Sequence, residues 1–405
     1  MKILFILPYS PVPPTFGGAT RVCYMMKNAS RHHELSILTW GDSNDERDLR
    51  SYFGENVHIH LVPEHWPRKF RRMGQLVSLF TPRSFFSMLV ESTAMKQELH
   101  RLLAKNSYDI IQTEFTHTAA YNLPSDAYRI IDSHNVEYDN FRRIYEKERS
   151  PLRKLHYYYE FKKFKKEERE ACLRYQSVFM TSERDKEILD QDVPEIPKYV
   201  VPNGVDSTYF TPSEESPEPY SLVFTGAMSY VPNNDGALHF LDAIFPLILK
   251  KVPQAKIYIV GGTPTKKLLH HASDNVIVTG FVDDVRPYIR RSNVYVVPLR
   301  MGSGTRLKVL EAMAMKIPIV TTSIGCEGID VHNGESVLIA DDPQTFADSV
   351  IRLMNDQSLR RKLTENGYET VTAQYTWSVI GEQVEALYKA FRPDRAQVKP
   401  EEVQV

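Results

Sequence analysis

The feature of this 405-residue chain that most constrains its fold is the alternation of short apolar runs with longer amphipathic stretches in both halves. The runs are rich in β-branched residues, as in the first-half segments ILFIL, LSILT, DIIQT and RIIDS and the second-half segments SLVFTG, KIYIVGG, VYVVPL and IPIVTT. Continuous apolar strands separated by helices are typical of parallel sheets covered on both faces. The pattern therefore predicts an α/β protein with two doubly wound, Rossmann-like domains.

A segment rich in proline, glutamate and serine, residues 201–220, separates the two halves. It begins with the turn sequence VPNG and continues into SEESPEP, a composition typical of a linker. We expect one domain over residues 1–200 and a second over 201–376, with a last helical pattern over 377–391. The tail 392–405 has no apolar periodicity, so it is predicted to be disordered.

Charge and cysteine content exclude several classes of protein. The chain has 50 basic and 51 acidic residues, so its overall field does not argue for a nucleic-acid partner. Cys23, Cys172 and Cys326 are far apart in the sequence and give neither a disulfide framework nor zinc-ligand spacing. No apolar run approaches the roughly 18 residues that a membrane helix needs. We therefore expect a cytoplasmic protein, with peripheral contact at the inner face of the membrane as its closest approach to lipid.

The segment PLRMGSGTRLKVLE carries the strongest signal of a binding site. Gly302 and Gly304 let the backbone come close to a ligand, and the free N–H groups of the helix that follows favour an anion. Arg306 and Lys308 add positive charge on the first turn, and Glu311 lies deeper, where a carboxylate can bind sugar hydroxyls. Phosphate at the helix tip and hydroxyls behind it indicate a nucleotide-sugar site.

This segment and the following AMAMKIPIV resemble the donor-binding region of family 4 glycosyltransferases, usually written Glu-x7-Glu. Glu311 matches the second Glu, whereas Ser303 stands at the first, which departs from the family pattern. The run VPNGVD resembles the family's interdomain segment, and 377–391 resembles its terminal helix, which crosses back to the first domain. The resemblance covers nearly the whole chain. It implies the GT-B fold, with a ligand in the cleft between two domains, and transfer with retention of configuration.

The same resemblance implies roles for individual residues. Catalytic or phosphate-binding roles fall on His134, Arg306, Lys308 and Glu311. Donor contacts are implied for Gly17, Gly18, Gly226, Gly262, Phe281, Gly302, Ser303, Gly304 and Thr305. The family usually carries an Arg and a Lys after the first strand of the second domain, but FTGAMSYVPNNDG has neither. We therefore expect Arg306 and Lys308 to neutralise the diphosphate instead, and we expect no metal and no cofactor because no metal-holding Asp-x-Asp is visible.

Residues 142–174 form a strongly basic segment, with twelve basic and six acidic side chains and interleaved aromatic ones. A helix of this kind can lie on an anionic membrane. The alternative is a solvated helix whose aromatic side chains pack on the domain. Because the family that this chain resembles often uses lipid-linked acceptors, we expect peripheral membrane contact here, and an acceptor that is lipid-linked or an oligosaccharide.

The sequence as a whole predicts a retaining glycosyltransferase. It would move a sugar from a nucleotide diphosphate-sugar to an acceptor hydroxyl in cell-surface polysaccharide or glycoconjugate synthesis. Two alternatives remain open. A GT-B nucleotide-sugar epimerase would need further acid/base carboxylates, and a non-catalytic nucleotide-sugar-binding subunit would fit both Ser303 and the missing Arg and Lys.

Overall fold

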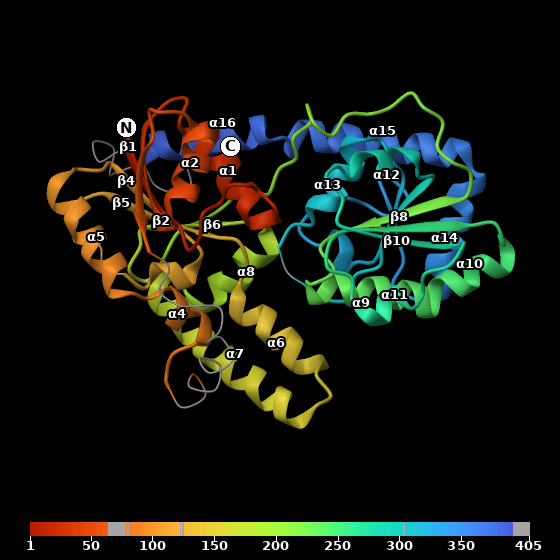
Figure 1. The fold of residues 1–405 in the computed structure, drawn as a ribbon, viewed down its shortest axis with the longest axis horizontal. Helices are drawn as coiled ribbons and strands as arrows, with labels where there is room; N and C mark the ends of the chain where they lie inside the picture. The colour runs from red at the N-terminus through yellow and green to blue at the C-terminus, as the bar shows by residue number, and fades with distance from the viewer. Residues whose placement is uncertain (64–77, 79–80, 122, 124, 303, 392–405) are drawn as a thin grey trace. The chain divides into compact units, whose positions relative to one another are not determined.

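The computed structural model divides into two α/β units, each built on one all-parallel sheet (Figure 1). Unit 1 holds residues 1–202 and the chain from Gly381 onward, and unit 2 holds Asn203–Ile380. The structure describes residues 1–63, 78, 81–121, 123, 125–302 and 304–391. The predicted tail 392–405 lies outside these ranges. Two parallel sheets of apolar strands confirm the α/β prediction.

Unit 1 contains a seven-stranded sheet in the order β3-β2-β1-β4-β5-β6-β7. Its strands are β1 (Lys2–Ile6), β2 (Glu34–Trp40), β3 (His58–Val62), β4 (Ile110–Glu114), β5 (Tyr128–Ser133), β6 (Ser177–Met180) and β7 (Lys198–Val200). Its helices are α1 (Gly17–Ala29), α2 (Ser43–Phe53), α4 (Phe85–Val90), α5 (Thr93–Lys105), the 3-10 helix η2 (Thr116–Ala120), α6 (Glu137–Lys147), α7 (Pro151–Cys172) and α8 (Glu183–Asp192). Every residue of β4 is buried, as expected for a central strand covered on both faces.

Unit 2 contains a six-stranded sheet in the order β10-β9-β8-β11-β12-β13. Its strands are β8 (Ser221–Thr225), β9 (Lys256–Val260), β10 (Val276–Gly280), β11 (Val294–Val297), β12 (Ile319–Thr321) and β13 (Leu338–Ile339). Its helices are α9 (Val231–His239), the π-helical η3 (Phe240–Ile244), α10 (Phe245–Lys251), α11 (Lys266–Leu269), α12 (Arg286–Arg291), α13 (Leu307–Ala314), the 3-10 helix η4 (Ile324–Cys326), α14 (Pro343–Asn355) and α15 (Gln357–Gln374). Helix α16 (Trp377–Ala390) starts in unit 2 and ends in unit 1.

Both sheets reverse their strand order at one place. In unit 1, β1 pairs with β2 on one side and with β4 on the other. In unit 2, β8 pairs with β9 and with β11. Ligands of open parallel sheets bind at the carboxyl ends of the strands beside such a switch point. The topology thus directs attention to the loops after β1 and β4, and to those after β8 and β11.

The basic segment 142–174 forms a helical hairpin, whereas its composition suggested a single helix. Helix α6 ends at Lys147, and Pro151 opens α7, a position that suits proline because the first helical N–H has no intrahelical partner. The hairpin projects away from the sheet of its own unit (Figure 1). Within the described residues, no helix is long and apolar enough to cross a membrane.

Candidate functional site

Glycines with positive φ follow four neighbouring strands of the unit 2 sheet. They are Gly226 after β8, Gly261 after β9, Gly280 at the end of β10, and Gly302 and Gly304 after β11, with φ between 71° and 148°. This backbone conformation is costly for a residue with a Cβ. At the carboxyl edge of this sheet the backbone therefore carries no side chain at these five positions, and Asn233, Lys308 and Arg306 pack against two of them.

Backbone hydrogen bonds connect three of these strand ends. The N–H of Gly226 donates to Val260 O at 2.9 Å, and that of Gly261 donates to Gly280 O at 3.1 Å. A Cβ on Gly261 would lie 2.0 Å from Gly226 O, closer than atoms can approach. Glycine at 261 is thus required by the close packing of the loops after β8 and β9.

Arg306 lies at the start of α13 and is largely buried, with 8% of its surface exposed. Arg306 is the N-cap residue and so precedes the first helical turn, whereas the sequence analysis had placed it on that turn. Its Nη1 donates to Gly304 O at 2.6 Å. Its guanidinium packs over Gly302, where a Cβ would lie 3.1 Å from Nη2. Arg306 therefore brings its charge to the glycine loop and the first turn of α13.

Lys308 reaches across to the end of β8. Its Nζ donates to Thr225 O at 2.6 Å and to Asn233 Oδ1 at 2.8 Å, and it lies 4.3 Å from the ring centroid of Phe224. Burial lowers the pKa of Lys308 to about 7, while the Glu311 carboxyl acts in the opposite direction. These contacts give Lys308 a role that the sequence did not indicate, because they tie α13 to β8 and α9.

Glu311 lies one turn further along α13 and is partly exposed. Within the described ranges, no hydrogen bond and no ion pair reaches its carboxyl group. Burial raises the pKa of Glu311 to about 7, and Lys308 limits this rise. A carboxyl group without a protein donor beside the switch point is suited to accept hydrogen bonds from a ligand.

The remaining residues predicted for the donor site lie around the same edge. Gly262 is half-buried after β9, and the side chain of Phe281 is 77% exposed after β10. Thr305 is buried beside Arg306. Ser303 lies outside the described residues, so the prediction for it stays a prediction.

In unit 1, the corresponding edge holds His134 directly after β5. Its Nε2 lies 2.8 Å from Oε2 of Glu114, the last residue of β4. Burial lowers the pKa of His134 to about 4, and burial together with the Asp132 carboxylate raises that of Glu114 well above its usual value. The imidazole of His134 is therefore neutral at pH 7, and the protonated form of Glu114 is favoured. Nδ1 of His134 forms no hydrogen bond within the described ranges and is the ring atom left for a ligand.

The other carboxyl oxygen of Glu114 is bound by a chain of buried hydrogen bonds. Gln112 Nε2 donates to Glu114 Oε1 at 2.8 Å, and the hydroxyl of Tyr388, on α16, donates to Gln112 Oε1. Sequence spacing could not predict this chain of hydrogen bonds, because Tyr388 is 276 residues away from Gln112. The signal in the sequence was the polar run Gln112, Thr113 and Glu114, which follows two isoleucines within one strand.

Arg21 and Asp132 form a second buried pair beside His134. Arg21 Nε and Nη2 donate to the Asp132 carboxylate at 2.8–3.2 Å, and both side chains are fully buried. The ligand-type atoms of Glu114, Asp132 and His134 lie within 4.8 Å of one another. A guanidinium already holds both Asp132 oxygens, and it would repel a cation. We therefore interpret the cluster as a hydrogen-bonded network.

The loop after β1 and the turn after β4 meet through aromatic side chains. Phe115 adopts a strained φ of 66°, and its ring lies 3.9 Å from that of His134 and 5.3 Å from that of His117. Strained residues of this kind cluster at functional sites. Gly17 and Gly18 open α1, and a Cβ on Gly18 would lie 3.0–3.2 Å from neighbouring aromatic side-chain atoms. Small residues are needed there.

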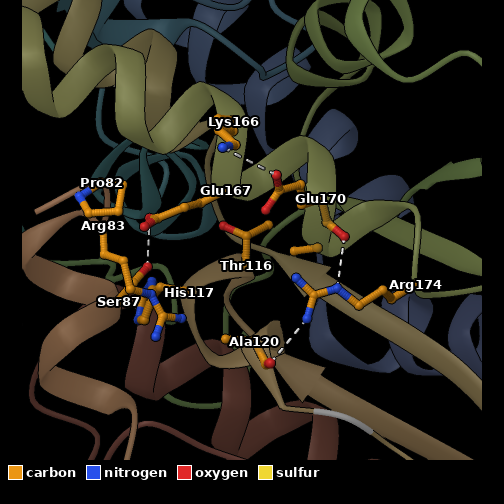
Figure 2. A pocket seen from close by; sticks show the side chains of 11 residues that line it. Pro82, Arg83, Ser87, Thr116, His117, Ala120, Lys166, Glu167, Glu170 and Arg174 are labelled. Carbon is orange, nitrogen blue, oxygen red and sulfur yellow. Dashed lines mark hydrogen bonds and ion pairs between the residues drawn. The ribbon is translucent and has the colours of Figure 1, made fainter.

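A pocket of about 160 Å³ lies between η2, α4 and the end of α7 (Figure 2). Its charged side chains are occupied by close partners. The carboxylate of Glu167 accepts from Ser87 Oγ at 2.7 Å, Lys166 Nζ lies 3.8 Å from Glu170, and Arg174 donates to the backbone of Ala120 at 3.1 Å. Because these side chains are already held by neighbouring groups and carry both signs of charge, we assign the pocket no ion.

Comparison with known proteins identifies relatives of the chain. Residues 219–356 match the family model described as Glycosyl transferases group 1. An uncharacterized 44.6 kDa protein in the cps region of Klebsiella pneumoniae is 24% identical over 92% of this chain and 96% of its own. The capsular polysaccharide biosynthesis glycosyltransferase CapM of Staphylococcus aureus is 28% identical over 39% of this chain and 43% of its own. The structure of Anabaena HepE in complex with UDP has a TM-score of 0.67 at 13% identity, covering 96% of this chain and 100% of HepE.

These matches bear on both units. Residues 219–356 contain the four glycine-ended strands and α13, so the candidate site of unit 2 lies within a glycosyl transferases group 1 domain. The similarity to HepE extends over nearly the whole chain. The chain therefore has the GT-B fold, as the sequence predicted, and its relatives include a bacterial capsule glycosyltransferase.

Proposed function

We propose that this chain, which carries a glycosyl transferases group 1 domain on the GT-B fold, transfers a sugar from a nucleotide diphosphate donor to an acceptor hydroxyl. The observation that carries the proposal is the carboxyl edge of the unit 2 sheet. There, four strands end in positive-φ glycines, and Glu311 presents a carboxyl group that no donor among the described residues reaches. Backbone approach suits a diphosphate, and a carboxylate suits the hydroxyls of a ribose or a sugar.

We assign the donor's outer phosphate to Arg306 and to the free N–H groups at the start of α13. A guanidinium and a helix N-terminus stabilise negative charge as it develops on a leaving diphosphate. In the proposed reaction the acceptor oxygen bonds to the anomeric carbon, the bond to the diphosphate breaks, and the acceptor proton passes to the leaving group. We propose that the reaction retains the configuration of the sugar. We also propose that it needs no metal, since the Arg306 guanidinium and the positive end of the α13 dipole supply the neutralising charge.

We assign the acceptor side of the reaction to unit 1, where His134 directs Nδ1 away from Glu114. A neutral imidazole can donate or accept one hydrogen bond at this atom. The hydrogen bond to Glu114 fixes the orientation of the ring. Because the relatives include a capsule glycosyltransferase, we expect a substrate from cell-surface polysaccharide synthesis.

The two other functions predict different products. An epimerase would need further carboxylates as acid and base, but Glu114 and Asp132 are fully buried and bonded to His134 and Arg21. Two experiments separate the three functions. A panel of nucleotide sugars is first screened by thermal shift, and the products formed with membrane and glycan fractions are then separated by chromatography. Free nucleoside diphosphate with the sugar on an acceptor is expected. An isomerised nucleotide sugar, or binding without any product, would overturn the proposal. Because HepE crystallised with UDP, uridine nucleotides are tested first.

A further inference from the structure

The outer face of α7 carries an apolar tip followed by basic side chains. Leu152, Leu155 and Tyr159 are 82%, 53% and 46% exposed. Exposed basic side chains continue along α7 at the same spacing of three or four residues, which places all of them on one helix face. We call this surface the α7 stripe. It consists of Leu152, Leu155, Tyr159, Lys162, Lys166 and Arg169.

The opposite face of α7 packs within the hairpin and on the unit. The rings of Phe141 on α6 and Phe164 on α7 stack with centroids 4.9 Å apart. Glu168 accepts hydrogen bonds from the backbone N–H groups of Glu137 and Tyr138 at the start of α6. The hairpin is therefore held together mainly by this opposite face. Of the α7 stripe, Arg169 also donates to Asp192 O at 3.2 Å, whereas Leu152 and Leu155 remain largely exposed.

Charge on the hairpin is unevenly distributed. Within the described side chains of 142–174, seven basic ones are exposed against two acidic ones. The basic ones are Arg142, Arg149, Arg153, Lys162, Lys166, Arg169 and Arg174, and the acidic ones are Glu146 and Glu170. The exposed surface of the hairpin is thus strongly positive, although the net charge of the whole chain is −1.

Residues 162–166 contain four lysines, and two of them bind partners in the fold. Lys163 Nζ donates to Ser78 O, and Lys165 Nζ lies 2.7 Å from Asp192 Oδ1. Lys162 forms no ion pair within the described ranges, and Lys166 is 70% exposed. The structure thus separates Lys163 and Lys165, which contact the fold, from the more exposed Lys162 and Lys166.

We propose that the α7 stripe docks on an anionic lipid bilayer, with its leucines entering the interface and its basic side chains contacting the head groups. An apolar tip followed by cations matches the layers of such a surface. The hairpin projects from its sheet, so its tip can reach a flat surface (Figure 1). A second copy of the chain would bring the same positive face and be repelled. This proposal does not depend on the donor site.

Vesicle sedimentation tests the proposal with full-length protein and two double variants, Leu152→Ser with Leu155→Ser, and Lys162→Gln with Lys166→Gln. Matched controls on unit 2 are Leu269→Ser and the pair Lys266→Gln with Lys267→Gln, all at exposed positions of α11. The probes are vesicles of phosphatidylglycerol with phosphatidylcholine, and of phosphatidylcholine alone, at low and high salt.

We expect wild-type protein to sediment with the anionic vesicles at low salt. Loss of two lysines should weaken partitioning about 30-fold, at roughly 1 kcal/mol for each basic residue near the surface. The leucine variant should weaken binding at both salt concentrations, and the controls should bind as wild type does. The proposal would be overturned if the wild-type protein did not sediment, or if both variants sedimented as well as the wild-type protein does. So would a wild-type dimer that the leucine variant converts to a monomer, since the α7 stripe would then be a contact between copies.

Discussion

Replacing Glu311 with glutamine removes a negative charge from the donor site while keeping the side-chain shape. No protein donor reaches this carboxyl group in the described part of the chain, so the substitution breaks no internal hydrogen bond and should leave the unfolding temperature nearly unchanged. Hydrogen bonds to a charged partner contribute about 1.5–3 kcal/mol and neutral ones about 0.5–1.5 kcal/mol. Two bonds to neighbouring hydroxyls should therefore lose roughly 2 kcal/mol, or about 30-fold in affinity.

The pKa of Glu311 adds a second test. With a pKa raised to about 7, the carboxyl group is mostly ionised at pH 8 and about one-tenth ionised at pH 6. The ratio of wild-type to Glu311→Gln affinity should fall from roughly 30 at pH 8 to roughly 4 at pH 6. Taking this ratio cancels ionisation of the ligand itself, which affects both proteins equally.

Isothermal titration calorimetry with the nucleoside diphosphate that gives the largest thermal shift measures these ratios. Glu335→Gln makes the same charge change at an exposed position before β13, at the opposite edge of the sheet, and should bind as wild type does. Equal affinity of wild type and Glu311→Gln at pH 8, or a ratio that does not change with pH, would refute the assignment of Glu311.

Three further substitutions test the structure around the site. Gly261→Ala should cost at least about 2 kcal/mol in the free energy of unfolding, since its Cβ would overlap Gly226 O and its φ is 148°. Gly334→Ala, at φ 77° with nothing within 4 Å of its Cβ, should cost about 1–2 kcal/mol. Urea unfolding of both variants measures the difference. Arg21→Met should cost about 3–5 kcal/mol by leaving a buried carboxylate unpaired, while exposed Arg47→Met should change little; similar unfolding midpoints would contradict the buried pair. Gln112→Leu should cost about 1–3 kcal/mol in the free energy of unfolding and shift the ¹⁵N resonances of the His134 ring, which Glu114 connects to Gln112. Unchanged His134 resonances would count against this chain of hydrogen bonds.

The fold could be predicted from sequence because its signals are local. Runs such as KIYIV and VYVV are too apolar and β-branched for a surface strand, and the glycine loops follow them directly. The position of Gly302 and Gly304 after β11, and of α13 after them, needed no tertiary information. The positive φ angles of these glycines are what the residue type suggests.

The contacts of single charged side chains could not be predicted in the same way. Lys308 was expected at a phosphate, but its Nζ finds Thr225 O, a partner 83 residues earlier in the chain. Arg21 lies on a helix where a basic residue suggests a solvent-facing position, yet its guanidinium is fully buried against Asp132, 111 residues away. Such pairings depend on which strands become neighbours, and spacing along the chain does not contain that information.

Hydrogen–deuterium exchange with and without a saturating nucleoside diphosphate tests the central claim most directly, because it reports where on the chain the ligand binds. The account predicts protection of the backbone N–H groups after β8, β9, β10 and β11 and in the first turn of α13. Protection confined to unit 1, or none at these four strand ends while calorimetry shows binding, would contradict the donor site proposed for unit 2.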